Sequence, residues 1–480
     1  MDLLGRYGTL AGTVWKIYHK RMRKDFGRMA VKPRIAIGAL IIKHYKQLSD
    51  EDTIQEILEN PYLQYFLGYS SYQFTPCFDP SLFVTIRKRL PARSIEYINE
   101  IFIQKVRELE KIEAEKKTRK PPKPPRDGDE QTTLPGIIEE SNQGKLIVDA
   151  TIAPSNIKYP TDLDLLNDSR EISEQLIDIL HQTGHFEKKP RTYRCLAQRD
   201  YLNVIKKKRK GKKILRNGIR KQLQYLRRNL SHIDQMLAIL KDHPGILKQR
   251  EQELLNTIQK IYVQQQEMYT NKNHTVKDRI VSIQQPYIRP MVRGKANADV
   301  EFGAKISVSV VKGFVFLDRL KWDAFNENLD LIAQVNKYRQ RFGYYPAVVI
   351  ADGIYGTREN RSYLKEHGIR FSGKKLGRPP KEIDAIAREV ECLRILEQGE
   401  RNEVEGKIGT AKTKYGLGKV MTRTQVTSEN WIAMAIFSMN MATALKRFLL
   451  SLLDVMKKWM KIIVSWKLID IKPEMLMVSI

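Results

Sequence analysis

The chain has 480 residues, 42% of them hydrophobic, and its 84 Lys and Arg residues against 55 Asp and Glu leave a formal net charge of +29. That length and apolar content are enough for about three domains with packed cores, which excludes a disordered polycation. The excess positive charge favours a polyanionic partner, most often nucleic acid, over a generally basic protein without one, because the basic residues cluster.

The cysteines and histidines carry no recognisable ligand pattern. Cys77, Cys195 and Cys392 are far apart and lack CxxC spacing, so neither disulfides nor a zinc site is expected, which fits a reducing cytoplasm. His181 and His185 are four residues apart, but no third ligand accompanies them, and we interpret them as solvated or core residues.

No membrane or export signal is expected. An acid at position 2 and the lack of an apolar segment near it argue against a signal peptide. The longest charge-free stretch near the C-terminus covers residues 430–445, and its 16 residues are too few to span a bilayer.

Residues 1–118 are predicted to be helical. Residues 49–61 combine polar N-cap candidates with apolar positions at helical spacing and a final proline, and a longer helix is expected over residues 94–117. The Pro-rich and charged residues 120–131 indicate a linker or exposed loop, which we extend to residues 119–140.

The rest of the chain predicts a mixed sheet with helices, hence the α/β class. Expected strands cover residues 145–153, 305–311, 314–318, 348–352 and 369–372, with Gly313 turning a hairpin and helices expected over residues 328–342 and 357–367.

A long insert, about residues 160–300, interrupts this sheet. A heptad seam of Ile and Leu runs from Ile219 to Leu240, a Pro–Gly break follows at residues 242–245, and apolar residues at heptad spacing resume from Leu247. The break favours an antiparallel helical hairpin over the alternative of one long helix that pairs with a second copy.

Positive charge is densest just before this seam. Residues 188–228 hold 17 Lys or Arg and one acid, Asp200. We expect the centre of this region to contact phosphates with little regard to base sequence, since such contacts release counterions; the alternative is a solvated basic loop. The predicted phosphate contacts are Lys206, Lys207, Lys208, Arg209 and Lys210.

Two aliphatic runs each end in an aspartate, Asp149 and Asp352. Alone, either residue is more often an N-cap or loop residue than a ligand. If the two runs are neighbouring strands with the same direction, both carboxylates emerge at one edge, where α/β folds usually place ligands.

A third carboxylate, Glu405, is expected on a helix that also presents Arg401 and Lys412 on the same face. The alternative is an ordinary surface ion pair. Three neighbouring carboxylates would repel one another unless cations intervene, and Mg²⁺ prefers oxygen ligands. Asp149, Asp352 and Glu405 are therefore the predicted metal ligands and catalytic residues, for displacement at phosphorus with two metal ions, and Arg401 and Lys412 are the predicted phosphate-binding residues.

These segments resemble the DDE transposases of bacterial insertion sequences, the cut-and-paste group. Arg401, Glu405 and Lys412 match the signature Y-x2-R-x3-E-x6-K, although Gln398 occupies the tyrosine position. The segments VDATIAP and VIADGIYG are similar to those around the two aspartates of this family. Residues 60–70 and 78–90 resemble its helical N-terminal domain.

The resemblance implies an RNase H-like core with Asp149 on its first strand, Asp352 on its fourth and Glu405 on a late helix. It implies Mg²⁺-dependent cleavage at the ends of the element, with two ions and Mn²⁺ as an alternative, followed by attack of the freed 3′-hydroxyl on target DNA. The implied partners are double-stranded DNA, as terminal inverted repeats and target, and a second copy of the chain in the DNA complex. We expect a bacterial cytoplasmic protein that associates with the nucleoid.

This interpretation predicts five regions: a helical N-terminal domain (1–118), a linker (119–140), a catalytic domain (141–160 and 301–445), a basic helical insertion (161–300) and a C-terminal helical tail (446–480). A decayed or repurposed DNA-binding protein and a metal-dependent nuclease of the same fold remain alternatives.

One further motif points to DNA. Gly377, Arg378 and Pro379 resemble the minor-groove tripeptide of AT hooks, so Arg378 is a predicted DNA contact. A basic loop near the active site is the alternative. The segment 322–327 after the hairpin is expected to pack at the core edge and is assigned no chemistry.

Overall fold

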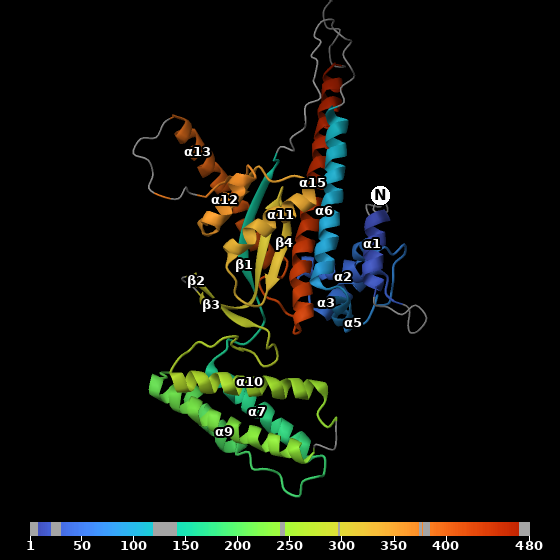
Figure 1. The fold of residues 1–480 in the computed structure, drawn as a ribbon. Coiled ribbons are helices and arrows are strands. Elements are labelled where there is room, and N and C mark those ends of the chain that lie inside the picture. The colour runs from blue at the N-terminus through green and yellow to red at the C-terminus, as the bar shows by residue number, and fades with distance from the viewer. Residues whose placement is uncertain are drawn as a thin grey trace, which may run out of the picture.

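The computed structural model describes residues 8–20, 30–118, 142–240, 245–295, 298–373, 377 and 385–469. A mixed sheet lies beside helices from both ends of the chain, and a separate group of helices extends beyond one end of the sheet (Figure 1). Each part has its own cluster of buried apolar side chains. The mixed α/β class predicted from the sequence is confirmed.

In the described part of the chain, six helices precede the first strand. As predicted, α3 begins after Ser49, whose hydroxyl accepts a hydrogen bond from the Asp52 N–H (2.9 Å). Asn60 ends α3 and caps α4, where Pro61 occupies the first helical position. The bounds are Gly8–His19 (α1), Pro33–Lys46 (α2), Asp50–Glu59 (α3), Pro61–Leu67 (α4), Leu82–Arg89 (α5) and Ala92–Thr118 (α6).

The sheet is built around its first strand. Strand β1 pairs antiparallel with β3 and parallel with β5, and β6 continues the sheet parallel to β5. The other edge of β3 carries both β2 and β4. The bounds are Lys145–Pro154 (β1), Arg289–Lys295 (β2), Ala298–Val311 (β3), Phe314–Lys321 (β4), Val348–Ile350 (β5) and Arg370–Phe371 (β6).

The predicted hairpin joins β3 to β4. Lys312 and Gly313 form its two-residue turn, and both have positive φ (49° and 77°), which suits the right-handed twist of the flanking strands. Gly313 adopts this backbone conformation without steric cost. Strand β2 was not predicted, because its sequence, RPMVRGK, lacks apolar alternation.

Helices follow the strands of the second half of the sheet. Beyond β4 a 3-10 turn leads into α11, a second 3-10 turn and α12 separate β5 from β6, and two consecutive helices lead away from β6. The bounds are Glu327–Asp330 (η1), Leu331–Phe342 (α11), Gly353–Tyr355 (η2), Arg358–Glu366 (α12), Ala385–Glu400 (α13) and Asn402–Lys414 (α14).

The chain leaves the sheet after Pro154 and returns at Arg289, and the intervening segment is helical. Helix α9 packs against both α7 and α10, and buried residues of its heptad seam, such as Leu226 and Ile233, lie at the centre of the second apolar core. Helices α7 and α8 were not predicted from the sequence. The bounds are Asp162–His181 (α7), Arg194–Ile205 (α8), Lys212–Ile239 (α9) and Gln249–Asn271 (α10).

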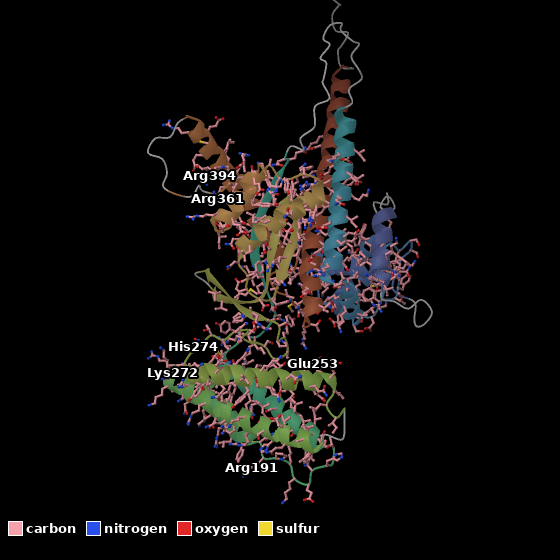
Figure 2. All side chains as sticks on the ribbon, viewed as in Figure 1. Arg191, Glu253, Lys272, His274, Arg361 and Arg394 are labelled. Carbon is pink, nitrogen blue, oxygen red and sulfur yellow. The ribbon has the colours of Figure 1, made fainter. Side chains whose placement is uncertain are left out.

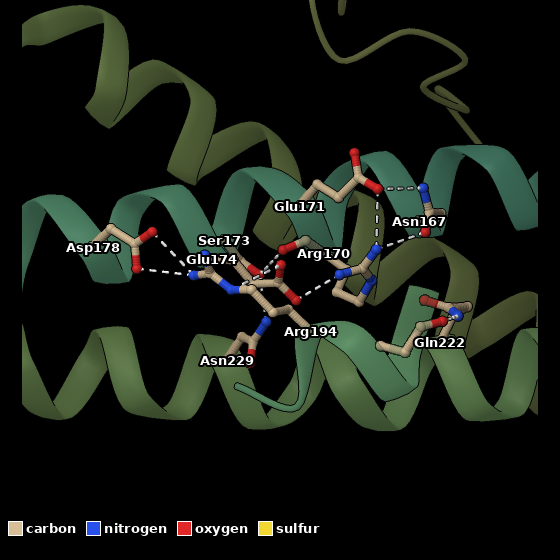
Figure 3. A network of polar contacts seen from close by, with 10 residues as sticks. Asn167, Arg170, Glu171, Ser173, Glu174, Asp178, Arg194, Gln222 and Asn229 are labelled. Atoms are coloured by element: carbon tan, nitrogen blue, oxygen red, sulfur yellow. Dashed lines mark hydrogen bonds and ion pairs between the residues drawn. The ribbon is translucent and has the colours of Figure 1, made fainter. Parts of the chain in front are cut away.

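A buried polar network reinforces this insert (Figure 3). The Arg170 side chain is only 1% exposed, and its guanidinium donates to the side-chain oxygens of Glu174 (2.5 Å) and Asn167 (2.8 Å). Arg194 at the start of α8 pairs with Asp178 of α7 (2.9 Å). Such a network ties α7 to its neighbours, because an unpaired charge left there would be costly.

The C-terminal helix α15 (Gln425–Ile469) ties the N-terminal helices to the sheet. Its buried Asn440 side chain accepts from the Val315 N–H (2.9 Å) and donates to the Val315 carbonyl (2.7 Å) and to Asn99 of α6 (2.9 Å). The His44 ring on α2 is within hydrogen-bond distance of the Tyr415 carbonyl (3.0 Å). The helices of residues 1–118 therefore share one apolar core with the sheet.

Helix α15 also changes the expectation about membrane spans. The charge-free stretch at residues 430–445 lies inside a longer segment, Gln425–Asp454, which by length and composition alone could cross a bilayer; it is the one such helix in the chain as the structure describes it. Because Trp431–Met439 form part of the apolar core, this segment also has the properties of a core helix, and one such helix is weak support for a membrane span.

Candidate active site

Asp149 lies on β1, and Asp352 follows the end of β5, the parallel neighbour of β1, by two residues. The register pairs Lys145 with Val348 and Ile147 with Ile350, a constant offset of 203 residues, and the two aspartates are separated by the same 203 (352 − 149). The predicted parallel pairing of these two segments is therefore confirmed.

The strand predicted over residues 145–153 is observed as β1, and Asp149 lies inside it rather than at its end. Strand β1 continues to Pro154 because β3 pairs with it along this whole stretch, and Asp149 lies opposite Val308. On the β5 side the regular strand stops at Ile350. The aspartate thus lies in the interior of one strand, beside the end of the next.

The Asp149 carboxylate is half-buried and lies among other charges. Its Oδ1 accepts a hydrogen bond from the Ala150 N–H (2.8 Å). Burial raises the pKa of Asp149 and the neighbouring Glu327 and Glu405 carboxylates raise it further, while the Ala150 N–H and Arg401 lower it. Burial is the largest of these effects, so the pocket disfavours the charged form of Asp149 in the absence of an added cation.

Asp352 is both the N-cap residue of a short helix and a partner of Arg401 in an ion pair. It caps the short 3-10 helix η2, where its Oδ1 accepts from the Gly353 N–H (2.5 Å), as an N-cap residue does. Its side chain is 55% exposed, and its Oδ1 lies 3.5 Å from the guanidinium of Arg401. The N-cap alternative is thus observed together with an ion pair to the helical segment.

Arg401 connects the second and third carboxylates. It immediately precedes α14, and its guanidinium pairs with Glu405 Oε1 at 2.7 Å and with Asp352 at 3.5 Å. Helix α14 packs on β1 through its buried face, which includes Val404, and an ion pair between Lys145 and Glu400 (2.5 Å) holds the preceding residues near the start of β1. Arg401 therefore pairs with two of the three predicted acids, and its charge also lowers the pKa of the third, Asp149.

The donor atoms suit a hard divalent cation, but they are not gathered as a metal site. Mg²⁺ prefers carboxylate oxygens, which Asp149, Asp352 and Glu405 offer. Among the residues that the structure describes, no three His, Cys, Asp or Glu side chains are close enough together to hold an ion. The guanidinium of Arg401 instead supplies the positive charge between Asp352 and Glu405, so binding of a metal there requires that this side chain move.

Lys412 and Gln398 flank these residues along the chain. Lys412 lies on α14, is half-buried, and its carbonyl accepts from the Gly418 N–H (3.2 Å). Gln398, at the tyrosine position of the signature, lies on α13, and its Oε1 accepts from the Ser372 hydroxyl (3.2 Å). The latter contact joins the segment after β6 to the segment that carries Arg401.

Two residues near Asp149 were not predicted. Glu327 lies in the segment 322–327 that was assigned no chemistry; it pairs with Lys305 (2.8 Å) and raises the pKa of Asp149. The buried Tyr355 has its pKa raised by burial and by Glu327 and Asp149. The position of Tyr355 within VIADGIYG was the available signal, whereas Glu327 had none, since the fold brings it there from another connection.

The predicted phosphate contacts Lys206–Lys210 belong to the helical insert rather than to the elements that carry the carboxylates. Lys206–Lys210 form the exposed connection between α8 and α9, in the helical group that Figure 1 shows beyond the end of the sheet. Arg378 lies outside the described residues. Figure 2 shows two other arginines, Arg361 and Arg394, on the α12–α13 side of the sheet, where Arg394 pairs with Glu391 (2.6 Å).

Two family models match the chain. Residues 349–442 match the family described as Transposase DDE domain, and residues 10–89 match Transposase domain (DUF772). The first match includes Asp352, Arg401, Glu405 and Lys412, whereas Asp149 lies outside it.

Comparisons with a similar protein and with solved structures give less information about the family of this chain than the family models do. Over 139 residues the chain is 29% identical to a protein of Rhizobium meliloti named "Uncharacterized protein ORF8 in nfe locus", which corresponds to 29% of this chain and 55% of that protein. The alignment thus spans about half the length of this relative. No solved structure matches the chain.

Proposed function

The chain belongs to the DDE transposases of the insertion-sequence type, and we propose that it cleaves DNA at the ends of an element and joins the freed 3′ ends to target DNA. The observation that carries this proposal is the convergence of Asp149, Asp352 and Glu405 around Arg401, from β1, the end of β5 and α14. Carboxylates on adjacent strands and a helix are suited to metal-assisted displacement at phosphorus.

The proposed catalytic core is an RNase H-like sheet. Its support is the central β1, with an antiparallel hairpin of β3 and β4 on one side and parallel β5 and β6 on the other. With β2 counted as an addition to this core, Asp352 would follow its fourth strand. The long helical insertion follows the first strand.

Asp149, Asp352 and Glu405 would hold two Mg²⁺ ions, or Mn²⁺ in their place. When bound, such ions activate a water or 3′-hydroxyl and stabilise the leaving oxygen. Asp149 would be the least mobile ligand, because its Oδ1 is already oriented by the Ala150 N–H and its side chain is half-buried. Glu405 and Asp352 are more exposed and would adjust to the ions.

Arg401 and Lys412 would act on the DNA phosphates. With cations held by Asp352 and Glu405, the guanidinium of Arg401 would be free to form paired hydrogen bonds with a phosphate. Lys412 lies two helical turns beyond Glu405, on the same face of α14, and would hold the backbone farther along. Both residues would offset negative charge that develops during cleavage.

The remaining regions would position the DNA. We assign recognition of the element ends to the helices of residues 1–118, through a helix set in a groove, and we expect the DNA complex to contain two copies of the chain. The predicted linker, residues 119–140, and the end of the predicted tail, residues 470–480, lie outside the described residues. Nucleoid association in a bacterial cytoplasm would follow from the DNA partner.

The test is metal-dependent cleavage of a duplex that carries the terminal inverted repeat. We expect Asp149→Ala, Asp352→Ala and Glu405→Ala each to lower the cleavage rate by at least about 10²-fold, because each removes charge stabilisation at the reacting phosphate, while DNA binding in EDTA stays within about threefold of wild type. Cleavage at the wild-type rate in Glu405→Ala would show that Glu405 is not a catalytic residue.

Two alternatives are separated by a second assay. A nuclease of the same fold would cut the duplex but would not join the 3′ end to another DNA, and a repurposed binding protein would do neither. A strand-transfer assay with a labelled element end and a plasmid target distinguishes all three. The carboxylates, Arg401 and Lys412 are all present in this chain, which favours an active enzyme over a silent one.

A further inference from the structure

A basic cleft lies in the helical insert, remote in sequence from all three carboxylates. It has a volume of about 680 Å³ and is formed by the end of α8, the start of α9 and the end of α10. Lys272, labelled in Figure 2, is the C-cap residue that follows α10, three residues beyond the lining residue Tyr269. The charged residues of its lining are Asp200, Lys207, Lys213, Arg216, Arg220 and Lys221.

The positive charge of this cleft is mostly unneutralised. Its one acid, Asp200, is already bound by Lys221 (2.9 Å) and by the Tyr225 hydroxyl (3.0 Å). Within the described ranges, the four other basic residues form no ion pair with a carboxylate. They are Lys207, Lys213, Arg216 and Arg220. Four such cations around one concave surface attract an anion that carries several charges.

Packed helices, rather than a loop, hold most of these cations in place. Gly218 lets α9 approach α8 closely, since a Cβ at this position would lie 3.1 Å from a methyl group of Val204. The Gln222 side chain donates to the Ala197 carbonyl of α8 (2.9 Å), and the Arg216 guanidinium lies over the Tyr269 ring of α10 (4.1 Å). The arrangement is therefore formed before any ligand binds, which reduces the entropy lost on binding.

We propose that this cleft binds a phosphodiester segment of the DNA backbone and anchors DNA away from the reacting phosphate. The choice of DNA rests on the proposed function; the choice of a phosphate-rich anion rests on the cleft itself. The proposal changes the sequence interpretation of the basic run, because Lys207 alone of Lys206–Lys210 lines the cleft. Its neighbours Lys208, Arg209 and Lys210 are exposed in the connection between α8 and α9.

This difference provides a matched control within one segment. The lining variant carries Lys207→Gln, Lys213→Gln and Arg220→Gln, and the loop variant carries Lys208→Gln, Arg209→Gln and Lys210→Gln. Both remove three positive charges from the same part of the full-length chain. Fluorescence anisotropy with a labelled duplex of arbitrary sequence, in EDTA and at several salt concentrations, measures binding without metal, so failure of the catalytic proposal leaves this experiment interpretable.

We expect the lining variant to weaken duplex binding by at least about 10-fold near physiological salt and to reduce the slope of log K against log salt by about 2–3. The loop variant should lose less than about threefold. Equal losses in the two variants would overturn the proposal, since they would indicate diffuse attraction to the whole basic region.

Lysine acylation of the wild-type protein gives a second readout that does not depend on the folding of a variant. Bound duplex should protect Lys207 and Lys213 from the reagent more than Lys208 and Lys210. Uniform protection of all four would contradict a discrete cleft. Inorganic pyrophosphate should compete with the duplex only weakly, because it carries fewer phosphates; competition at equal phosphate concentration would assign the cleft to a small anion rather than to DNA.

Discussion

The sheet and the helical insert contrast in both charge and core. The sheet gathers carboxylates around one arginine, whereas the insert gathers lysines and arginines around a cleft with a single, already paired acid. Their apolar cores are separate clusters, and the insert adds a buried ion network centred on Arg170. The chain thus assigns the acids and the basic surface to parts that are stabilised separately.

This separation has a physical advantage. Carboxylates close to an extended basic patch would be neutralised by lysines, and their affinity for cations would fall. Placing the basic cleft on its own helices keeps its positive charge at a distance, beyond the end of the sheet (Figure 1), where ionic strength screens its effect on the acids. If the two parts are independent, a change in the core of one should leave the other folded.

The largest expected effect tests this independence. Leu226 is fully buried at the centre of the insert core, so Leu226→Ala should destabilise the insert by about 2–5 kcal/mol through lost contacts and a cavity. All five tryptophans, Trp15, Trp322, Trp431, Trp459 and Trp466, lie outside the insert. Thermal unfolding followed by tryptophan fluorescence should therefore change little, while the transition followed by helical circular dichroism should gain an earlier phase.

The control for this experiment lies in the other core. Ile306 is equally buried on β3, and Ile306→Ala should lower the fluorescence transition. A fluorescence transition that shifts as much in Leu226→Ala as in Ile306→Ala would show that the two cores unfold together.

Low pH should destabilise the core that the N-terminal helices share with the sheet, because this core surrounds His44. Full burial lowers the pKa of His44 to about 3, although its contact with the Tyr415 carbonyl opposes this shift. In the unfolded chain the imidazole takes a proton near pH 6.5, so stability is complete above that pH and falls by about 1.4 kcal/mol per unit as the pH decreases toward 3. His44 packs against Trp431 (4.6 Å between ring centroids), so tryptophan fluorescence reports this loss directly.

The matched variant is His44→Gln, which keeps an N–H donor but does not titrate. Its stability should be lower at pH 7, yet flatter between pH 6.5 and 4 than that of the wild type. An unchanged slope would assign the acid sensitivity to other groups.

Much of the sheet was predictable because its signals are local. Aliphatic runs predict β1 and β5, and their parallel pairing then places Asp149 beside Asp352. The Gly313 turn predicts the hairpin of β3 and β4. The end of β1 was predicted to within one residue, whereas β5 is shorter than the predicted 348–352 and stops at Ile350.

The features that could not be predicted from the sequence depend on contacts between segments that are distant in the chain. Glu327 approaches Asp149 from a connection that shows no chemical signal in the sequence. The cleft could not be deduced from charge density, because Lys207 and Lys208 are adjacent in the same exposed connection and only the packing of α8, α9 and α10 makes Lys207 a lining residue. The sequence of α7 is amphipathic, but its apolar spacing is less regular than the heptads of α9.

The smallest expected effect concerns Arg401 and tests whether its guanidinium competes with a divalent cation for the carboxylates of the sheet. Its pairs with Glu405 and Asp352 are partly exposed, so Arg401→Gln should lower stability in EDTA by less than about 1 kcal/mol. Without the guanidinium, the carboxylates should repel one another more and gain more from a divalent cation. Adding Mg²⁺ should therefore raise the melting temperature of Arg401→Gln more than that of the wild type, as expected for an ion that binds the folded state more tightly.

Lys145→Gln, which removes a neighbouring ion pair to Glu400 but no charge between Asp352 and Glu405, is the control and should respond to Mg²⁺ like the wild type. An equal or smaller response in Arg401→Gln would show that the arginine does not occupy the place of the cation, and that metal binding does not compete with this side chain.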